Sequence, residues 1–175
     1  MIKHLIKNAL AQLYPPVYTR GVLILNYHSV NPDHEFSLPP AEFERQMIFL
    51  KEHYKVISLS DYGKGPVSPG VQVVITFDDG YEDNYIHAFP ILKRLNMPAT
   101  IFLTTDFVCK GVNIAKDWLV YNGLRPLQEA HIKEMLGSAI SIGSHGQTHA
   151  HGAALSEEAF AMELHQSQNM LEHTF

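Results

Sequence analysis

One stretch decides the fold expected for this chain: Val71-Gln72-Val73-Val74-Ile75-Thr76-Phe77-Asp78-Asp79-Gly80. Its first part is apolar and mainly β-branched, which is typical of a strand buried in a parallel sheet. Two adjacent carboxylates and a glycine follow. Because α/β enzymes place their catalytic groups at the carboxyl ends of parallel strands, we expect Asp78 and Asp79 to lie at a functional edge.

A second strand-like run ends in histidines. Residues 139–143 precede Ser144-His145-Gly146-Gln147-Thr148-His149, which places two imidazoles four positions apart. Each motif alone is a weak signal, since Asp-Asp-Gly often forms a solvated turn and a chain with 11 histidines contains chance pairs. The placement of both motifs after strand-like runs favours a shared metal site.

The residue types fit a catalytic metal site. A zinc-like centre uses about three His or carboxylate ligands and leaves a position open for water, and Asp79, His145 and His149 are the candidate ligands. The candidate base is Asp78, which would take a proton from a water whose pKa the metal lowers. The residues alone leave open which aspartate has which role. A divalent transition metal, Zn²⁺ in preference to the oxygen-seeking Ca²⁺, is the expected cofactor.

Several segments together resemble one family. Thr76–Gly80 and His145–His149 are similar to the first two motifs of the polysaccharide deacetylases, the NodB-homology domains of carbohydrate esterase family 4. Leu25-Asn26-Tyr27-His28-Ser29-Val30 and Pro98–Leu103 also resemble segments of its members. Tyr27-His28 closes the first expected strand, so His28 has either a role in the site or a structural hydrogen bond.

The resemblance implies a fold, an activity and a set of roles. The fold is α/β, a distorted (β/α)7 barrel. Asp78 is the base, and Asp79, His145 and His149 are metal ligands. The expected activity is a metal-dependent hydrolase that removes N-acetyl groups from an amino-sugar polysaccharide or oligosaccharide, so the expected partner is an acetylated amino-sugar polymer.

The later motifs of the family are expected to be missing from this sequence. They comprise an Arg-containing loop and a late Leu-x-His, expected after a helix that begins near Ser156, and no arginine follows Arg125. We therefore expect a barrel that is incomplete at the C-terminus. The alternative function is a catalytically impaired barrel fragment that keeps metal or glycan binding, and the incomplete edge is expected to favour self-association.

Composition agrees with one globular domain. The chain has 175 residues, of which 46% are hydrophobic and 18% charged. The net charge of -5 disfavours nucleic acid as a partner. The single cysteine, Cys109, excludes an internal disulfide and is expected to be buried. No apolar run reaches transmembrane length, and residues 1–13 are too polar for a signal peptide, so we expect a cytoplasmic location.

The expected elements alternate between strand and helix. Residues 1–20 are expected to form an amphipathic helix and a Pro-containing connector, which caps the barrel or touches a membrane surface, and residues 21–175 a partial NodB-homology domain. Strands are expected over 22–26, 55–58, 71–76, 100–103 and 139–143. Helices are expected over 40–53, 82–95, 127–136 and 156–173.

Overall fold

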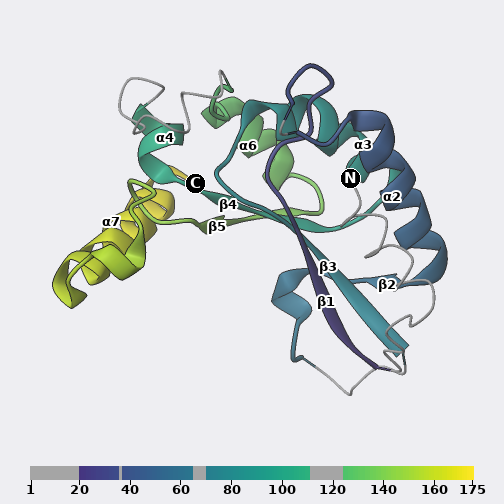
Figure 1. Ribbon diagram of the computed structural model, residues 1–175, viewed down its shortest axis with the longest axis horizontal. Coiled ribbons are helices and arrows are strands. Elements are labelled where there is room, and N and C mark those ends of the chain that lie inside the picture. Colours follow the sequence, from purple (N-terminus) through teal and green to yellow (C-terminus); the bar gives the residue numbers. More distant parts are fainter. Residues whose placement is uncertain (1–19, 36, 65–69, 111–123) are drawn as a thin grey trace, which may run out of the picture.

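The computed structural model describes residues 20–35, 37–64, 70–110 and 124–175, which form a parallel sheet flanked by helices (Figure 1). The strands are β1 (Arg20–Tyr27), β2 (Lys55–Val56), β3 (Gly70–Phe77), β4 (Ala99–Leu103) and β5 (Ile140–Ser144). The helices are α2 (Pro40–His53), α3 (Phe89–Leu95), α4 (Thr105–Lys110), α6 (Glu129–Leu136) and α7 (Glu157–Thr174). Short turns are η1 (Leu59–Asp61), η2 (Asn84–Ala88) and η3 (Gly152–Ala154). The α/β class is confirmed.

The strand order is β1-β3-β4-β5, with β2 beside β3. One whole edge of β3 pairs with β1, in register from Arg20↔Gly70 to Tyr27↔Phe77. The other edge is shared, because β2 pairs near its start at Lys55↔Gln72 and β4 pairs near its end at Thr76↔Thr100. Since all pairs are parallel, every strand ends at the same side of the sheet, where the two sequence motifs lie.

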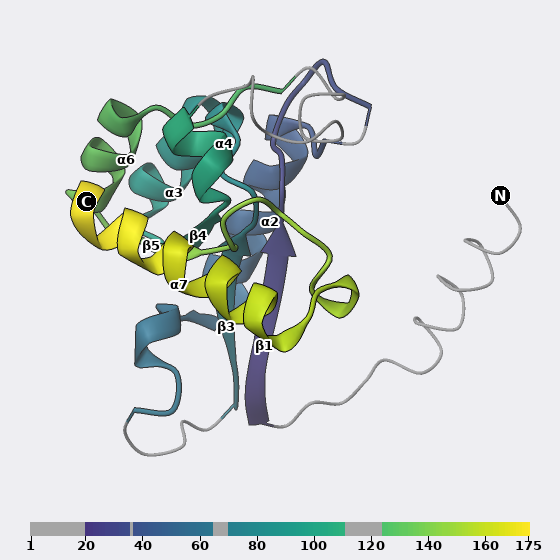
Figure 2. The same cartoon turned by 90° about the vertical axis from the view of Figure 1, so that its left-hand side faces the viewer.

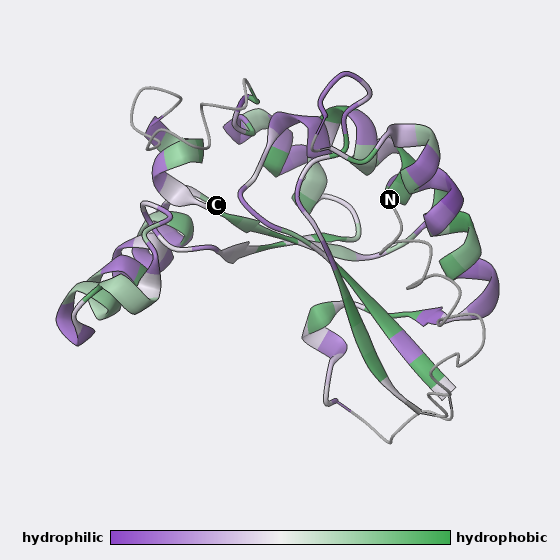
Figure 3. Ribbon diagram, viewed as in Figure 1, coloured by the Kyte–Doolittle hydropathy of each residue, from purple (hydrophilic) through white to green (hydrophobic). Residues whose placement is uncertain are grey.

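One face of the sheet is covered by α2, α3 and α6 (Figure 1). Alternate strand residues point to this face, as the period of two requires. The largest fully buried side chains are Phe43, Phe77, Phe107, Met47, Ile75, Leu92, Ile101, Leu103, Leu127, Ile132 and Met135. Figure 3 shows β1 and β3 as mainly hydrophobic, whereas α2 alternates between hydrophobic and hydrophilic residues. The alternation of residues along the strands therefore places one set of apolar side chains in the core.

The helix expected over 82–95 contains a widened turn. Residues Asn84–Ala88 form a π-helix, and α3 continues from Phe89. Pro90 lacks an N–H, and in an α-helix its ring would crowd the carbonyl four residues back, which the wider turn accommodates. Asn96 ends the helix in the left-handed region at φ 52°.

Two expectations about local structure need correction. The short helix α4 was not expected, because its residues directly follow a strand and show no helical period over six positions. Cys109 on this helix is exposed and not buried. Successive helix positions are about 100° apart, so the fully buried Phe107 turns Cys109 to the outside. The helix expected from residue 127 begins at Glu129.

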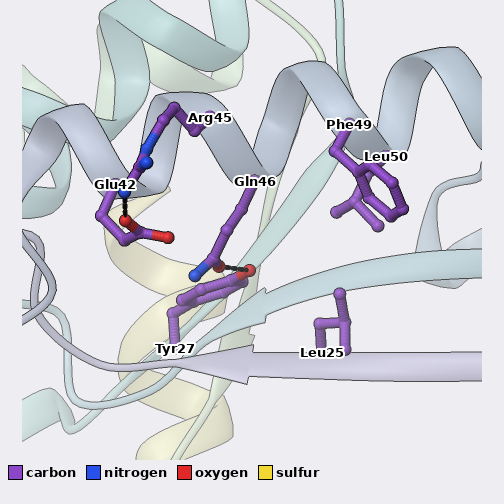
Figure 4. Close-up of a pocket in the computed structure, with 7 residues that line it drawn as sticks. All are labelled: Leu25, Tyr27, Glu42, Arg45, Gln46, Phe49 and Leu50. Carbon is purple, nitrogen blue, oxygen red and sulfur yellow. Dashed lines mark hydrogen bonds and ion pairs between the residues drawn. The ribbon is translucent and has the colours of Figure 1, made fainter. Parts of the chain in front are cut away.

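Residues 1–19 lie outside the described ranges, and the expected N-terminal helix lies among them. The division into residues 1–20 and 21–175 therefore stays a prediction. No helix in the described ranges is long and apolar enough to cross a membrane. A cavity of about 410 Å³ lies between α2 and β1 (Figure 4), lined by Leu25, Tyr27, Glu42, Arg45, Gln46, Phe49 and Leu50.

Candidate metal centre

The ends of β3, β4 and β5 bring the two motifs together. The N–H of Asp78 donates to the carbonyl of Tyr27 at 3.0 Å, which carries the β1–β3 pairing into the motif. The N–H of His145 donates to the carbonyl of Leu103 at 2.9 Å, and the N–H of Thr104 donates to the carbonyl of Asp79 at 3.2 Å. The backbone at the end of β4 therefore bridges the aspartate pair and the histidine loop.

The three candidate ligands converge. Asp79 Oδ1 lies 3.2 Å from His149 Nε2 and 3.4 Å from His145 Nε2. One ligand atom from each of the three residues lies within 4.8 Å of the others, and the two imidazole centroids are 5.1 Å apart. One buried carboxylate and two half-buried imidazoles therefore face a common point.

The environment of Asp79 fits a bound cation. The residue is fully buried, and within the described ranges neither carboxylate oxygen receives a hydrogen bond of good geometry. An ionised group in that state is unfavourable unless an ion or a charged partner compensates it. Two imidazole nitrogens and a carboxylate oxygen are a donor set that suits Zn²⁺ and related transition metals.

Two of the three candidate ligands have left-handed backbone. Asp79 has φ 74° and His149 has φ 60°, values that side-chain-bearing residues adopt at a cost of roughly 1–3 kcal/mol. Gly80 continues the turn at φ 85°, and a Cβ there would lie 2.7 Å from Leu103 Cδ2. The N–H of Leu127 holds this turn by donating to the carbonyl of Gly80 at 2.9 Å. Such outliers point to a functional site when the surrounding contacts enforce them.

Asp78 borders the cluster from the more exposed side, with 18% of its side chain accessible. Asn26 Nδ2 donates to Asp78 Oδ2 at 2.7 Å, and Thr76 Oγ1 donates to Asn26 Oδ1 at 2.9 Å. The threonine thereby fixes the orientation of the amide. Asp78 Oδ1 lies 4.0 Å from His145 Nδ1, and Asp78 Oδ2 lies 3.9 Å from Nε2 of the half-exposed His28.

Asp79 raises the pKa of two neighbouring groups. Burial lowers the pKa of His149, but the adjacent Asp79 carboxylate raises it by more, so the net pKa lies above the ordinary value. Burial, and then the charge of Asp79, raise the pKa of Tyr81 far above its usual range. The Tyr81 hydroxyl is therefore a neutral group beside a buried carboxylate.

A buried network holds the loop that follows β1. Asp83 accepts hydrogen bonds from Ser29 Oγ at 2.5 Å and from the N–H of Val30 at 3.3 Å. Asn84 Nδ2 donates to the carbonyl of His28 at 2.8 Å. Burial raises the pKa of Asp83 against the lowering effect of these bonds. The residues after the aspartate motif thus anchor the segment that carries His28.

Sequence reasoning missed Asn26 as the partner of Asp78. The residue stands in the segment that resembles the family, but its spacing from the aspartates gives no signal, because the contact joins residues 52 positions apart. The expectation that the late Leu-x-His pattern is missing is wrong, because Leu171-Glu172-His173 has this pattern. His173 is exposed near the end of α7, with Nδ1 2.6 Å from the carbonyl of Asn169, and does not join the cluster.

Comparison with known proteins identifies the class. The polysaccharide deacetylase family pattern matches residues 66–175. The chain is 32% identical over 159 residues to YxkH of Bacillus subtilis (strain 168), a protein assigned to the polysaccharide deacetylases, covering 87% of this chain and 52% of that protein. It is 34% identical over 108 residues to the poly-beta-1,6-N-acetyl-D-glucosamine N-deacetylase of Staphylococcus aureus (strain MSSA476), covering 50% and 37% respectively.

Solved structures agree on the fold. The Streptococcus pyogenes deacetylase PplD, solved in complex with acetate, superposes with a TM-score of 0.74 at 23% identity, over 87% of this chain and 68% of that one. The chain belongs to the polysaccharide deacetylase family, and its fold is of the NodB-homology type. It spans about half the length of YxkH and less of the staphylococcal enzyme.

Proposed function

We propose that this chain is a metal-dependent N-deacetylase that removes acetyl groups from an amino-sugar polysaccharide or oligosaccharide. The observation that carries the proposal is the buried Asp79 carboxylate facing two imidazole nitrogens at 3.2 and 3.4 Å, with a second carboxylate beside the cluster. The family and the staphylococcal relative, which is named for an N-acetylglucosamine polymer, support the same reaction class.

The residues have separable roles in this proposal. Asp79, His145 and His149 would hold the metal, which when bound supplies a Lewis acid for the amide carbonyl and lowers the pKa of a water. Asp78 would accept the proton of an attacking water. Its Oδ2 is occupied by Asn26, which leaves Oδ1, on the His145 side, to act as the base.

Imidazole nitrogens favour a zinc-like ion over Ca²⁺ and Mg²⁺, which take oxygen ligands. We therefore propose Zn²⁺ or a similar divalent transition metal as the cofactor. The proposed substrate class rests on the names of the family and of the staphylococcal relative, which describe the deacetylation of polysaccharides.

Binding without efficient turnover is the second candidate. In this candidate the chain holds the metal, but no group of the chain stabilises charge on the reacting carbonyl. A group that stabilises charge on the reacting carbonyl typically contributes about 10²–10³-fold to the rate. Such a chain would keep metal or glycan binding but hydrolyse slowly.

One experiment separates the two candidates. The Zn²⁺-loaded chain is incubated with N-acetylglucosamine oligomers of several linkages, and acetate and free amine are quantified together with oligomer binding. Equal release of acetate and amine, lost in Asp79→Ala, supports the deacetylase. Metal or oligomer binding without acetate release supports the second candidate. The absence of metal binding contradicts the deacetylase, and the absence of both metal and oligomer binding contradicts both candidates.

A further inference from the structure

The helix α7 lies beside the loop that follows β5 (Figure 2). A carboxylate on this helix contacts the loop. Thr148 donates both its N–H and its hydroxyl to Glu163 Oε1, the hydroxyl at 3.0 Å. Glu163 is partly buried, whereas the other glutamates of the helix, Glu157, Glu158 and Glu172, are exposed. The Glu163 carboxylate is therefore directed at the loop and not at solvent.

The loop is shaped to receive this carboxylate. Gly146 has φ 82°, and a Cβ at this position would lie 3.4 Å from Glu163 Oε1. His149, the residue after Thr148, has φ 60°, a conformation that histidine adopts at a cost. The two hydrogen bonds to Thr148 thus fix the peptide that leads directly into the strained residue.

A second contact comes from the same side of α7. Ser167, one helical turn after Glu163 and fully buried, places its Oγ 2.6 Å from Ser144 Oγ. On the other side of the loop, the N–H groups of Thr105 and Asp106 donate to the carbonyls of residues 146 and 147 at 3.2 and 2.9 Å. Glu163 holds the loop from the α7 side through its hydrogen bonds from Thr148.

We propose that Glu163 is a positioning residue for His149, so that metal affinity depends on the contact between α7 and the histidine loop. The inference rests on the proposed metal site and goes beyond it, because Glu163 is neither a ligand nor the base. Residues that orient metal ligands from outside the coordination shell typically change metal affinity by about 10–100-fold when they are removed.

A rival explanation is that the negative charge of Glu163 attracts the cation over a distance. Two substitutions separate the explanations. Glu163→Gln removes the charge but keeps an oxygen that accepts from Thr148, whereas Glu163→Ala removes both. Positioning requires that Gln resembles the wild type and Ala does not, while attraction by charge requires equal losses.

The test measures Zn²⁺ affinity by chelator competition and the Co²⁺ absorption spectrum of the full chain. We expect Glu163→Ala to weaken Zn²⁺ binding about 10–100-fold and to alter the Co²⁺ spectrum, and Glu163→Gln to lose less than about threefold. Thr148→Val should weaken binding only when Glu163 is present. Glu172→Ala, which removes an exposed carboxylate of the same helix, is the matched control and should change nothing.

Unchanged affinity in Glu163→Ala, or equal losses for Ala and Gln, would overturn the inference. Amide hydrogen exchange of Thr148 in the metal-free chain provides a readout that is independent of the metal. Protection that is present in the wild type and in Glu163→Gln but lost in Glu163→Ala supports the positioning contact. If the wild type binds no metal, the proposed function fails, and this exchange measurement still decides whether Glu163 holds the loop.

Discussion

Two aspartates that are neighbours in sequence have different environments. Asp79 is fully buried against the two histidines, whereas Asp78 is partly exposed and bonded to Asn26. The cause is the backbone, since φ 74° at Asp79 turns the chain away from the strand and sends the two side chains to different places. The two environments are consistent with the proposed roles of Asp79 as a metal ligand and Asp78 as the base.

The two histidines should be required for metal binding. We expect His145→Ala and His149→Ala each to lose most of the bound Zn²⁺, because removing one of three ligands leaves too few donors for a stable site. Metal analysis after dialysis measures this, with His173→Ala, an exposed histidine of α7, as the control. Wild-type occupancy in both variants would remove the site.

Asp78 should be required for turnover but not for metal binding. Asp78→Asn keeps the shape of the side chain but cannot accept a proton, so we expect the deacetylation rate to fall roughly 10²–10⁴-fold. The Zn²⁺ affinity should stay within a few-fold of the wild type. Exposed Asp33 provides the control variant, Asp33→Asn. Loss of metal in Asp78→Asn would mean that the roles of the two aspartates are exchanged.

Metal affinity should fall in acid. A ligating imidazole must be neutral, and Asp79 raises the pKa of His149 above the ordinary value of about 6.5 in the metal-free chain. Affinity should therefore be full above this raised pKa and should fall as the pH drops through it. Zn²⁺ titrations at several pH values between about pH 5 and pH 8 give the affinity at each pH. An affinity that begins to fall only below the ordinary histidine range would contradict the effect of Asp79.

At the scale of elements, the strands were predictable and some of the connections were not. The apolar run before the aspartates predicted β3 to within one residue at each end, and the helix expected over 156–173 is α7, whose N-cap Ser156 accepts the N–H of Ala159 at its Oγ. The π-turn over Asn84–Ala88 depends on how Pro90 fits a helix packed on the sheet. A local period in the sequence does not encode that packing.

The turn after β3 should tolerate no side chain at Gly80. Gly80→Ala combines an unfavourable φ of 85° with a Cβ 2.7 Å from Leu103 Cδ2, so we expect a loss of stability of roughly 1–3 kcal/mol or more. Gly63→Ala is the control, because Gly63 has φ 74° but open space around it. Urea unfolding of both variants measures the difference. Equal losses would mean that the contact with Leu103 has no cost.

At the scale of the whole molecule, the described part of β1 pairs on one edge only. Ile24 in this strand is 54% exposed, and the cavity beside α2 adds apolar surface. Unpaired edges with exposed apolar residues favour pairing with another chain. We expect concentration-dependent association of two copies, measured by analytical ultracentrifugation and weakened by Ile24→Lys. Ile86→Lys, at a similarly exposed isoleucine outside the sheet, is the control. A monomer at every concentration would contradict this.

The sequence was enough to predict which residues form the candidate site, but not which residues hold them in place. The motifs gave Asp79, His145 and His149 because each follows a strand, and parallel strands end together. The supports, Asn26 and Glu163, come from β1 and α7, and their partners are fixed by packing across the molecule. Local spacing contains no information about such contacts.

Because β2 and β4 pair with different parts of one edge of β3, the sheet has two distinct ends. These ends should differ in how well they tolerate an added chemical group. β2 occupies the part of that edge where the strand begins, and Gly63 near η1 has no atom within 4 Å of where a Cβ would lie. The histidine loop lies where the strands finish. A fluorescent label or an affinity peptide attached beside Gly63 would therefore report on the protein while leaving its chemistry at the opposite end undisturbed.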